Sequence, residues 1–136
     1  MQEESKTIPM MEACRRVGMT YQTLKYYCNQ GLVPNVKRDK NNRRVFDEHD
    51  IEWLKGLVCL KGCGLSIDEM RTYTELCLQG EHSIPQRKEM LAGKRDGLLR
   101  RMEELQKCVD YIDWKQEFYD NVLAGKEEYR SNLLLK

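Results

Sequence analysis

The chain has 136 residues, a formal net charge of +1, 40% hydrophobic residues and 33% charged residues. This length suits one domain, or a small domain with an appendage, and the composition favours a soluble, mostly helical protein over a β-sandwich. No run approaches the roughly 18 consecutive apolar residues of a membrane-spanning helix, and the N-terminus lacks a signal-peptide pattern. We therefore expect a cytoplasmic protein whose cysteines are free thiols. The six cysteines are Cys14, Cys28, Cys59, Cys63, Cys77 and Cys108.

The near-neutral charge of the whole chain hides an asymmetry. Residues 1–46 contain nine basic and four acidic residues, a net charge of +5, so the remaining ninety residues carry −4. A basic N-terminal part indicates contact with a polyanion.

Two short helices are predicted at the start of the basic part. Pro9, followed by apolar residues spaced by three and four, indicates the first helix, and Gly18 ends it. Thr20 offers an N-cap to the second helix, over residues 21–29, before Gly31. Two short helices joined by a tight turn form a helix-turn-helix candidate.

A basic segment and two further helices are predicted next. Residues 33–46 place an Asn-Asn turn between two strand-capable ends, which predicts a β-hairpin wing. Asp47 or Asp50 is expected to cap the following helix, which ends at a Gly-Cys-Gly break, and Ser66 with Glu69 predicts a capping box for another helix. Residues 7–78 are thus expected to form a winged helix-turn-helix DNA-binding domain.

A long helix is predicted after a polar connector over residues 79–83. Within residues 84–120, apolar residues follow a seven-residue repeat, which is typical of a coiled coil. The seam consists of Leu91, Leu98, Met102, Leu105, Val109, Ile112 and Tyr119. We expect this helix to form a homodimer, with packing inside a single chain as the alternative.

The predicted fold is therefore mainly α, with a small β-hairpin wing and a long dimerisation helix. The tail over residues 121–136 is expected either to fold back as a short helix or to fray, and we expect no large organic-ligand pocket in so short a segment.

The expected DNA contacts come from the second helix and the wing. Their amide, phenol and ammonium groups suit base edges and phosphates in a major groove, and the basic side chains suit flanking phosphates. These residues are Tyr21, Gln22, Lys25 and Tyr26 in the helix, and Lys37, Arg38, Arg43 and Arg44 in the wing. For Tyr26 and Tyr27, one of the two rings must pack inward.

The order of these elements and three motifs resemble the MerR family of bacterial transcription regulators. The motifs are GMTYQTLKYY over residues 18–27, GLVP over residues 31–34, and RRVF over residues 43–46 with Asp50 and Ile51 after it. Where the family usually has Arg-Tyr-Tyr-Glu or Arg-Phe-Tyr-Glu, this chain has Lys-Tyr-Tyr-Cys over residues 25–28. A point charge therefore replaces a forked guanidinium, which keeps phosphate contact but not bidentate base reading.

The resemblance implies a homodimer that binds a palindrome within a promoter spacer and distorts the DNA, so that RNA polymerase engages the promoter. Residues 50–67 resemble the branch of the family that responds to aldehydes, nitric oxide and other electrophiles through one cysteine, and Cys59 falls on the sensing position. Without that resemblance, the alternative interpretation of Cys59 is favoured, in which it is a small apolar residue buried in the core.

Other functions remain alternatives at this stage. A different effector, such as a metal ion or a small ligand, and a constitutive DNA-binding repressor are both open. We expect neither a metal site nor a cofactor, because no C-x-x-C pair occurs. An enzyme is not expected, because the two histidines, His49 and His82, accompany no nucleophile motif or phosphate-binding loop.

Overall fold

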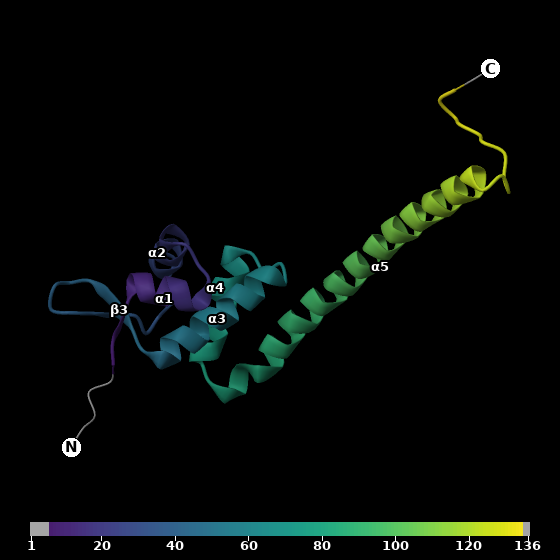
Figure 1. Ribbon diagram of the computed structural model, residues 1–136. Helices are drawn as coiled ribbons and strands as arrows, with labels where there is room; N and C mark the ends of the chain where they lie inside the picture. Colours follow the sequence, from purple (N-terminus) through teal and green to yellow (C-terminus); the bar gives the residue numbers. More distant parts are fainter. Residues whose placement is uncertain (1–5, 135–136) are drawn as a thin grey trace. The chain divides into compact units, whose positions relative to one another are not determined.

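The computed structural model describes residues 6–134 and confirms the mainly helical winged helix-turn-helix fold (Figure 1). The elements in chain order are β1 (Ile8–Pro9), α1 (Met10–Val17), α2 (Tyr21–Asn29), β2 (Lys37–Arg38), β3 (Arg44–Phe46), α3 (Glu48–Gly62), α4 (Ile67–Leu78), the 3₁₀ turn η1 (Glu81–Ser83) and α5 (Ile84–Leu123). The chain divides into two compact units, Met1–Arg95 and Asp96–Lys136.

The sheet of the first unit is larger than the predicted hairpin. Strands β2 and β3 form the wing, with Lys37 opposite Val45. The unpredicted strand β1 pairs with the other edge of β3, with Ile8 opposite Phe46, so the order is β1-β3-β2. Pro9 ends this edge strand and is the N-cap of α1, whereas the sequence placed it in the first helical turn.

The predicted helix starts are confirmed by side-chain caps. The Thr20 hydroxyl accepts a hydrogen bond from the backbone N–H of Thr23 at 3.1 Å and caps α2. Asp47 is the N-cap of α3, and Asp50 completes a reciprocal capping box. The predicted box between Ser66 and Glu69 is also present, at the start of α4.

One hydrophobic core joins the helices and the sheet of the first unit. Leu24 of α2, Phe46 of β3 and Ile51 of α3 are fully buried in it. Burial of such side chains supplies the main favourable free energy for packing. The core therefore fixes one face of α2 and leaves the other face free.

Acid is expected to destabilise this unit through its cap carboxylates. The backbone N–H of Asp50, and then the Lys37 ammonium, lower the pKa of Asp47. The Lys94 ammonium is the main cause that lowers the pKa of Glu69. A lowered folded-state pKa gives stability that is complete above the unfolded-state value of about 4 and is lost as pH falls through the folded value. Urea unfolding of the full chain should therefore give a smaller free energy of unfolding at pH 3 than at pH 7.

Two variants separate the cap from the ion pair at the start of α3. Asp47→Ala should lower the free energy of unfolding at pH 7 by about 0.5–2 kcal/mol, because the helix loses its N-cap. Asp47→Asn keeps a good cap but cannot titrate, so its stability should depend less on pH between pH 3 and pH 7. An equal pH dependence in the wild type and in Asp47→Asn would contradict a contribution from this carboxylate.

Helix α5 is continuous over 40 residues and is about 60 Å long at the usual rise (Figure 1). It extends past the predicted end at residue 120, to Leu123. The predicted connector contains the turn η1, in which Ser83 is fully buried. Among the helices of the described residues, none is long and apolar enough to cross a membrane.

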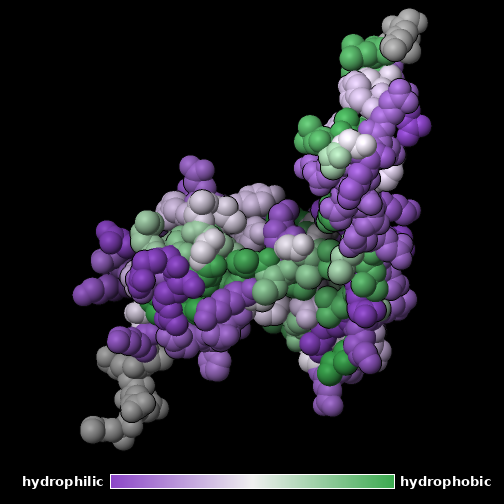
Figure 2. Space-filling model, turned by 45° about the vertical axis from the view of Figure 1, so that its right-hand side comes forward, coloured by the Kyte–Doolittle hydropathy of each residue, from purple (hydrophilic) through white to green (hydrophobic). Residues whose placement is uncertain are grey.

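The predicted seam of α5 contains large apolar side chains that are exposed in the single chain. Met102 and Leu105 are 64% and 61% exposed, and Val109 and Ile112 are exposed as well. Figure 2 shows hydrophobic side chains among the hydrophilic ones along this helix. Within residues 6–134, helix α5 has no buried residue, so the described part of the chain does not bury this seam.

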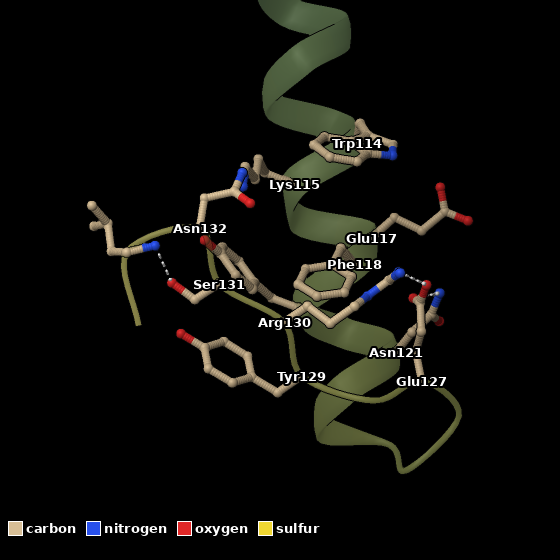
Figure 3. A pocket seen from close by; sticks show the side chains of 12 residues that line it. Trp114, Lys115, Glu117, Phe118, Asn121, Glu127, Tyr129, Arg130, Ser131 and Asn132 are labelled. Atoms are coloured by element: carbon tan, nitrogen blue, oxygen red, sulfur yellow. Dashed lines mark hydrogen bonds and ion pairs between the residues drawn. The ribbon is translucent and has the colours of Figure 1, made fainter. Parts of the chain in front are cut away.

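The tail forms no helix over residues 124–134, so the expectation of a short helix is not met there. The chain turns at Gly125, where φ is 72°, and residues 127–133 face the last turns of α5 (Figure 3). Together these segments line an open hollow of about 710 Å³. This hollow is open to solvent and is lined by both polar and apolar side chains. The hollow is lined by Trp114, Lys115, Glu117, Phe118, Tyr119, Asn121, Glu127, Tyr129, Arg130, Ser131, Asn132 and Leu133.

Candidate nucleic-acid interface and cysteine sites

Helix α2 has one buried face and one exposed face. Leu24 and Tyr27 are buried in the core. Tyr21 and Tyr26 are each 47% exposed, and Gln22 is exposed beside them. The prediction that one ring of the tyrosine pair packs inward is confirmed, and Tyr27 is that ring.

The outer face of α2 carries the predicted combination of polar groups. Lys25 is exposed on the same helix as Tyr21, Gln22 and Tyr26. An ammonium, an amide and two phenols on one exposed helix match the groups that contact phosphates and base edges. The structure therefore brings the four predicted residues of α2 together on its solvent side.

The wing turn is shaped by Asp39. Its carboxylate accepts hydrogen bonds from the backbone N–H groups of Asn41 at 2.9 Å and Arg43 at 3.0 Å. Asn42 adopts a left-handed conformation with φ of 60°, which asparagine tolerates. Arg38 donates to the Asn42 carbonyl at 2.9 Å, so its guanidinium lies at the turn. The sequence did not single out Asp39, although an Asx turn is a known role for this residue type.

The two remaining basic residues of the predicted interface are tied to neighbouring elements. Arg44 donates to the side-chain oxygen of Asn29 at 2.7 Å, which links the wing to the end of α2. Lys37 contacts the cap carboxylates of α3, with its ammonium 2.9 Å from Asp47 and 3.5 Å from Asp50. These contacts raise the pKa of Lys37, with the hydrogen bond to Asp47 as the largest cause. Lys37 thus secures the wing to α3.

Two arginines that the sequence did not assign also position the interface. Arg16 of α1 forms a bidentate pair with Glu48 of α3, at 2.8 and 2.7 Å. Arg71 of α4 donates to the backbone carbonyl of Gln30 at 3.2 Å and so holds the C-terminal end of α2. The pairs lie far apart in sequence, so local patterns do not reveal them.

The six cysteines differ in exposure. Cys14 is buried and Cys28 is half-buried, and burial raises the pKa of both thiols. Cys63 is half-buried against the core. Cys14 is part of the hydrophobic core.

Cys59 is exposed on α3, so in this chain it is not the small buried residue of the alternative interpretation. Lys55, one turn earlier, pairs with Glu52 at 3.3 Å. Its ammonium is therefore shared with a carboxylate. Cys108 is the other exposed cysteine.

The comparisons with known proteins agree with this geometry. The family model described as MerR HTH family regulatory protein matches residues 8–76. An uncharacterised HTH-type transcriptional regulator of Haemophilus influenzae is 30% identical over 118 residues, which is 87% of each chain. The HTH-type transcriptional regulator AdhR of Bacillus subtilis is 38% identical over 88 residues, 65% of this chain and 63% of AdhR.

A solved structure extends the likeness beyond the family segment. HiNmlR, a MerR family regulator lacking the sensor domain and bound to promoter DNA, superposes with a TM-score of 0.75 and 29% identity. The match covers 88% of this chain and 94% of HiNmlR. These relatives are transcriptional regulators, a non-enzymatic class. The chain belongs to the MerR family of helix-turn-helix transcriptional regulators.

Proposed function

We propose that this protein is a sequence-specific DNA-binding regulator that acts on a promoter as a homodimer. The observation that carries the proposal is the exposed polar face of α2 beside a basic wing, in a chain similar to a regulator bound to promoter DNA. In this proposal α2 reads the major groove through Tyr21, Gln22, Lys25 and Tyr26. Arg38, Arg43 and Arg44 of the wing contact flanking phosphates, and Lys37 acts by securing the wing.

The unpaired seam of α5 supports the homodimer. A row of exposed apolar side chains at heptad spacing is stabilised when a second helix covers it. Two copies related by a twofold axis present two α2 helices, which match a palindromic DNA site. In this proposal the full seam, from Leu91 and Leu98 to Tyr119, faces the second copy.

The dimer is proposed to act by distorting the promoter spacer. Bending costs a few kcal/mol that depend on the DNA sequence, and the additional contacts of the bent state offset this cost. RNA polymerase then contacts promoter elements whose relative placement the regulator has changed.

Cys59 is the proposed sensing residue. Its thiol is exposed on α3, and the surrounding segment resembles the electrophile-responsive branch. When the S–H group adds across an aldehyde carbonyl, sulfur bonds to carbon and the thiol proton moves to the carbonyl oxygen, so no oxidant is needed. Helix α3 packs against α1 and the sheet, so an adduct on it lies within the DNA-binding unit.

The test is transcription in vitro with purified, reduced protein and either formaldehyde or methylglyoxal. An aldehyde that acts through Cys59 should change transcription with the wild type. It should do the same with Cys108→Ser, the control variant that lacks the other exposed thiol. Cys59→Ser should bind the same DNA but lose the response, and mass spectrometry should locate the wild-type adduct at Cys59. An undiminished response in Cys59→Ser would exclude Cys59 as the sensor. Binding without any response in the wild type would favour a constitutive repressor.

A further inference from the structure

A second hollow lies in the DNA-binding unit and has a nucleophile in its wall. Its volume is about 240 Å³, and it opens between the segment after α2, helix α3 and helix α4. The lining side chains include Val33, Pro34, Trp53 and Leu78, which are apolar, and the cysteine is Cys77. Cys77 is half-buried, so its thiol is more sheltered than that of Cys59.

A guanidinium contacts the Cys77 sulfur. Arg87 Nη1 lies 3.8 Å from Cys77 Sγ. The same guanidinium donates to the Gly80 carbonyl at 2.7 Å and to the Ser83 hydroxyl at 3.1 Å. The guanidinium is thus placed to stabilise negative charge that develops on this sulfur when it reacts.

A phenol also contacts this sulfur. Burial is the main cause that raises the pKa of Tyr73, and its charge interaction and hydrogen bond with Cys77 raise it further. Tyr73 therefore stays a neutral phenol, which can donate a hydrogen bond. Its ring stacks on Trp53, a residue that lines the hollow, with centroids 6.5 Å apart. Cys77 thus has a cation, a donor and an adjoining apolar cavity.

We propose that Cys77 is a second electrophile-reactive site, selective for apolar α,β-unsaturated aldehydes and ketones. The thiolate adds to the β-carbon and forms a carbon–sulfur bond, the double-bond electrons move to the carbonyl as an enolate, and water protonates the α-carbon. The net change is addition of S–H across the double bond, with no oxidant or reductant. The apolar chain of the electrophile occupies the hollow, which the exposed Cys59 does not adjoin.

The site lies where the DNA-binding helices connect to α5. Arg87 belongs to the start of α5, and its contacts with Cys77, Gly80 and Ser83 hold this helix to the end of α4 and to η1. Alkylation converts the Cys77 thiol that Arg87 contacts into a thioether and adds bulk at the junction. The chemical reaction at Cys77 is independent of DNA binding, while any effect on promoter output depends on the proposed function.

The experiment uses the full chain carrying Cys59→Ser, so that the proposed sensor does not compete. The reduced protein is treated with trans-2-octenal or with acrolein, the shortest enal, and peptide mass spectrometry follows adducts at Cys77 and Cys108 over time. With octenal we expect Cys77 to react faster than the more exposed Cys108. With acrolein this preference should shrink, because acrolein has no chain to occupy the hollow.

Arg87 variants test the cation contact. Arg87→Gln should slow the reaction of Cys77 by roughly fivefold or more and leave Cys108 unchanged, whereas Arg87→Lys should retain part of the rate. Circular dichroism checks that each variant is folded. If octenal modifies Cys77 no faster than Cys108 in the Cys59→Ser protein with Arg87 unchanged, the proposal is overturned, whatever the Arg87 variants show. An unchanged Cys77 rate in folded Arg87→Gln also overturns it, and neither result bears on Cys59.

Discussion

Leu105→Glu should convert the proposed homodimer to a monomer and weaken binding to operator DNA by about 100-fold or more. Leu105 lies at the centre of the α5 seam and is 61% exposed in the single chain. In a paired helix, two introduced carboxylates would be desolvated without partners, which costs several kcal/mol. A monomer then contacts one half-site and loses the gain from binding two half-sites at once.

Sedimentation velocity and fluorescence anisotropy on labelled DNA measure the two effects. Lys107→Glu is the matched control, because it introduces the same side chain two residues away, on the face opposite the seam. It should remain dimeric and bind DNA with nearly unchanged affinity. Dimeric Leu105→Glu with wild-type DNA affinity would contradict dimerisation through this seam.

The double variant Arg38→Ala/Arg43→Ala is expected to weaken DNA binding by at least about tenfold and to reduce its salt dependence. Both side chains are exposed on the wing, at the turn that Asp39 shapes. Each phosphate contact contributes about 0.9 to the slope of log affinity against log salt concentration, so two contacts in each of two copies contribute roughly 3 to 4.

Anisotropy titrations at several salt concentrations measure this slope. Arg100→Ala/Lys107→Ala removes the same number of positive charges from exposed positions of α5 that lie away from the seam. This control should keep the slope close to that of the wild type. Equal slopes for the wing variant and the wild type would show that Arg38 and Arg43 do not contact phosphates.

Local features of this fold could be predicted because they depend on a few adjacent residues. The Thr20 cap of α2 and the capping box of Ser66 and Glu69 follow from spacing within one turn of helix, whereas for α3 the sequence left Asp47 and Asp50 as alternative caps. Strand β1 could not be predicted in this way, because two residues that include Pro9 give no strand pattern, and pairing with β3 is decided by the tertiary fold.

The candidate sites required the three-dimensional arrangement. The sequence predicts a phosphate contact for Lys37 and does not show that its ammonium also lies 2.9 Å from Asp47 and 3.5 Å from Asp50. The exposure of Cys59 depends on which face of α3 the core covers, which the apolar pattern alone left open. The contact between Arg87 and Cys77 depends on the turn at η1, which brings α5 back to the end of α4.

Selection of bound sequences from a random pool of double-stranded DNA tests the central claim most directly. Purified, reduced full-length protein is used, and the selected sequences are footprinted. A homodimer that reads DNA through α2 and the wing should enrich an inverted repeat with two symmetric protected half-sites, related by about one helical turn or a multiple of it. Absence of enrichment, or a single site without twofold symmetry, would contradict sequence-specific binding by a homodimer.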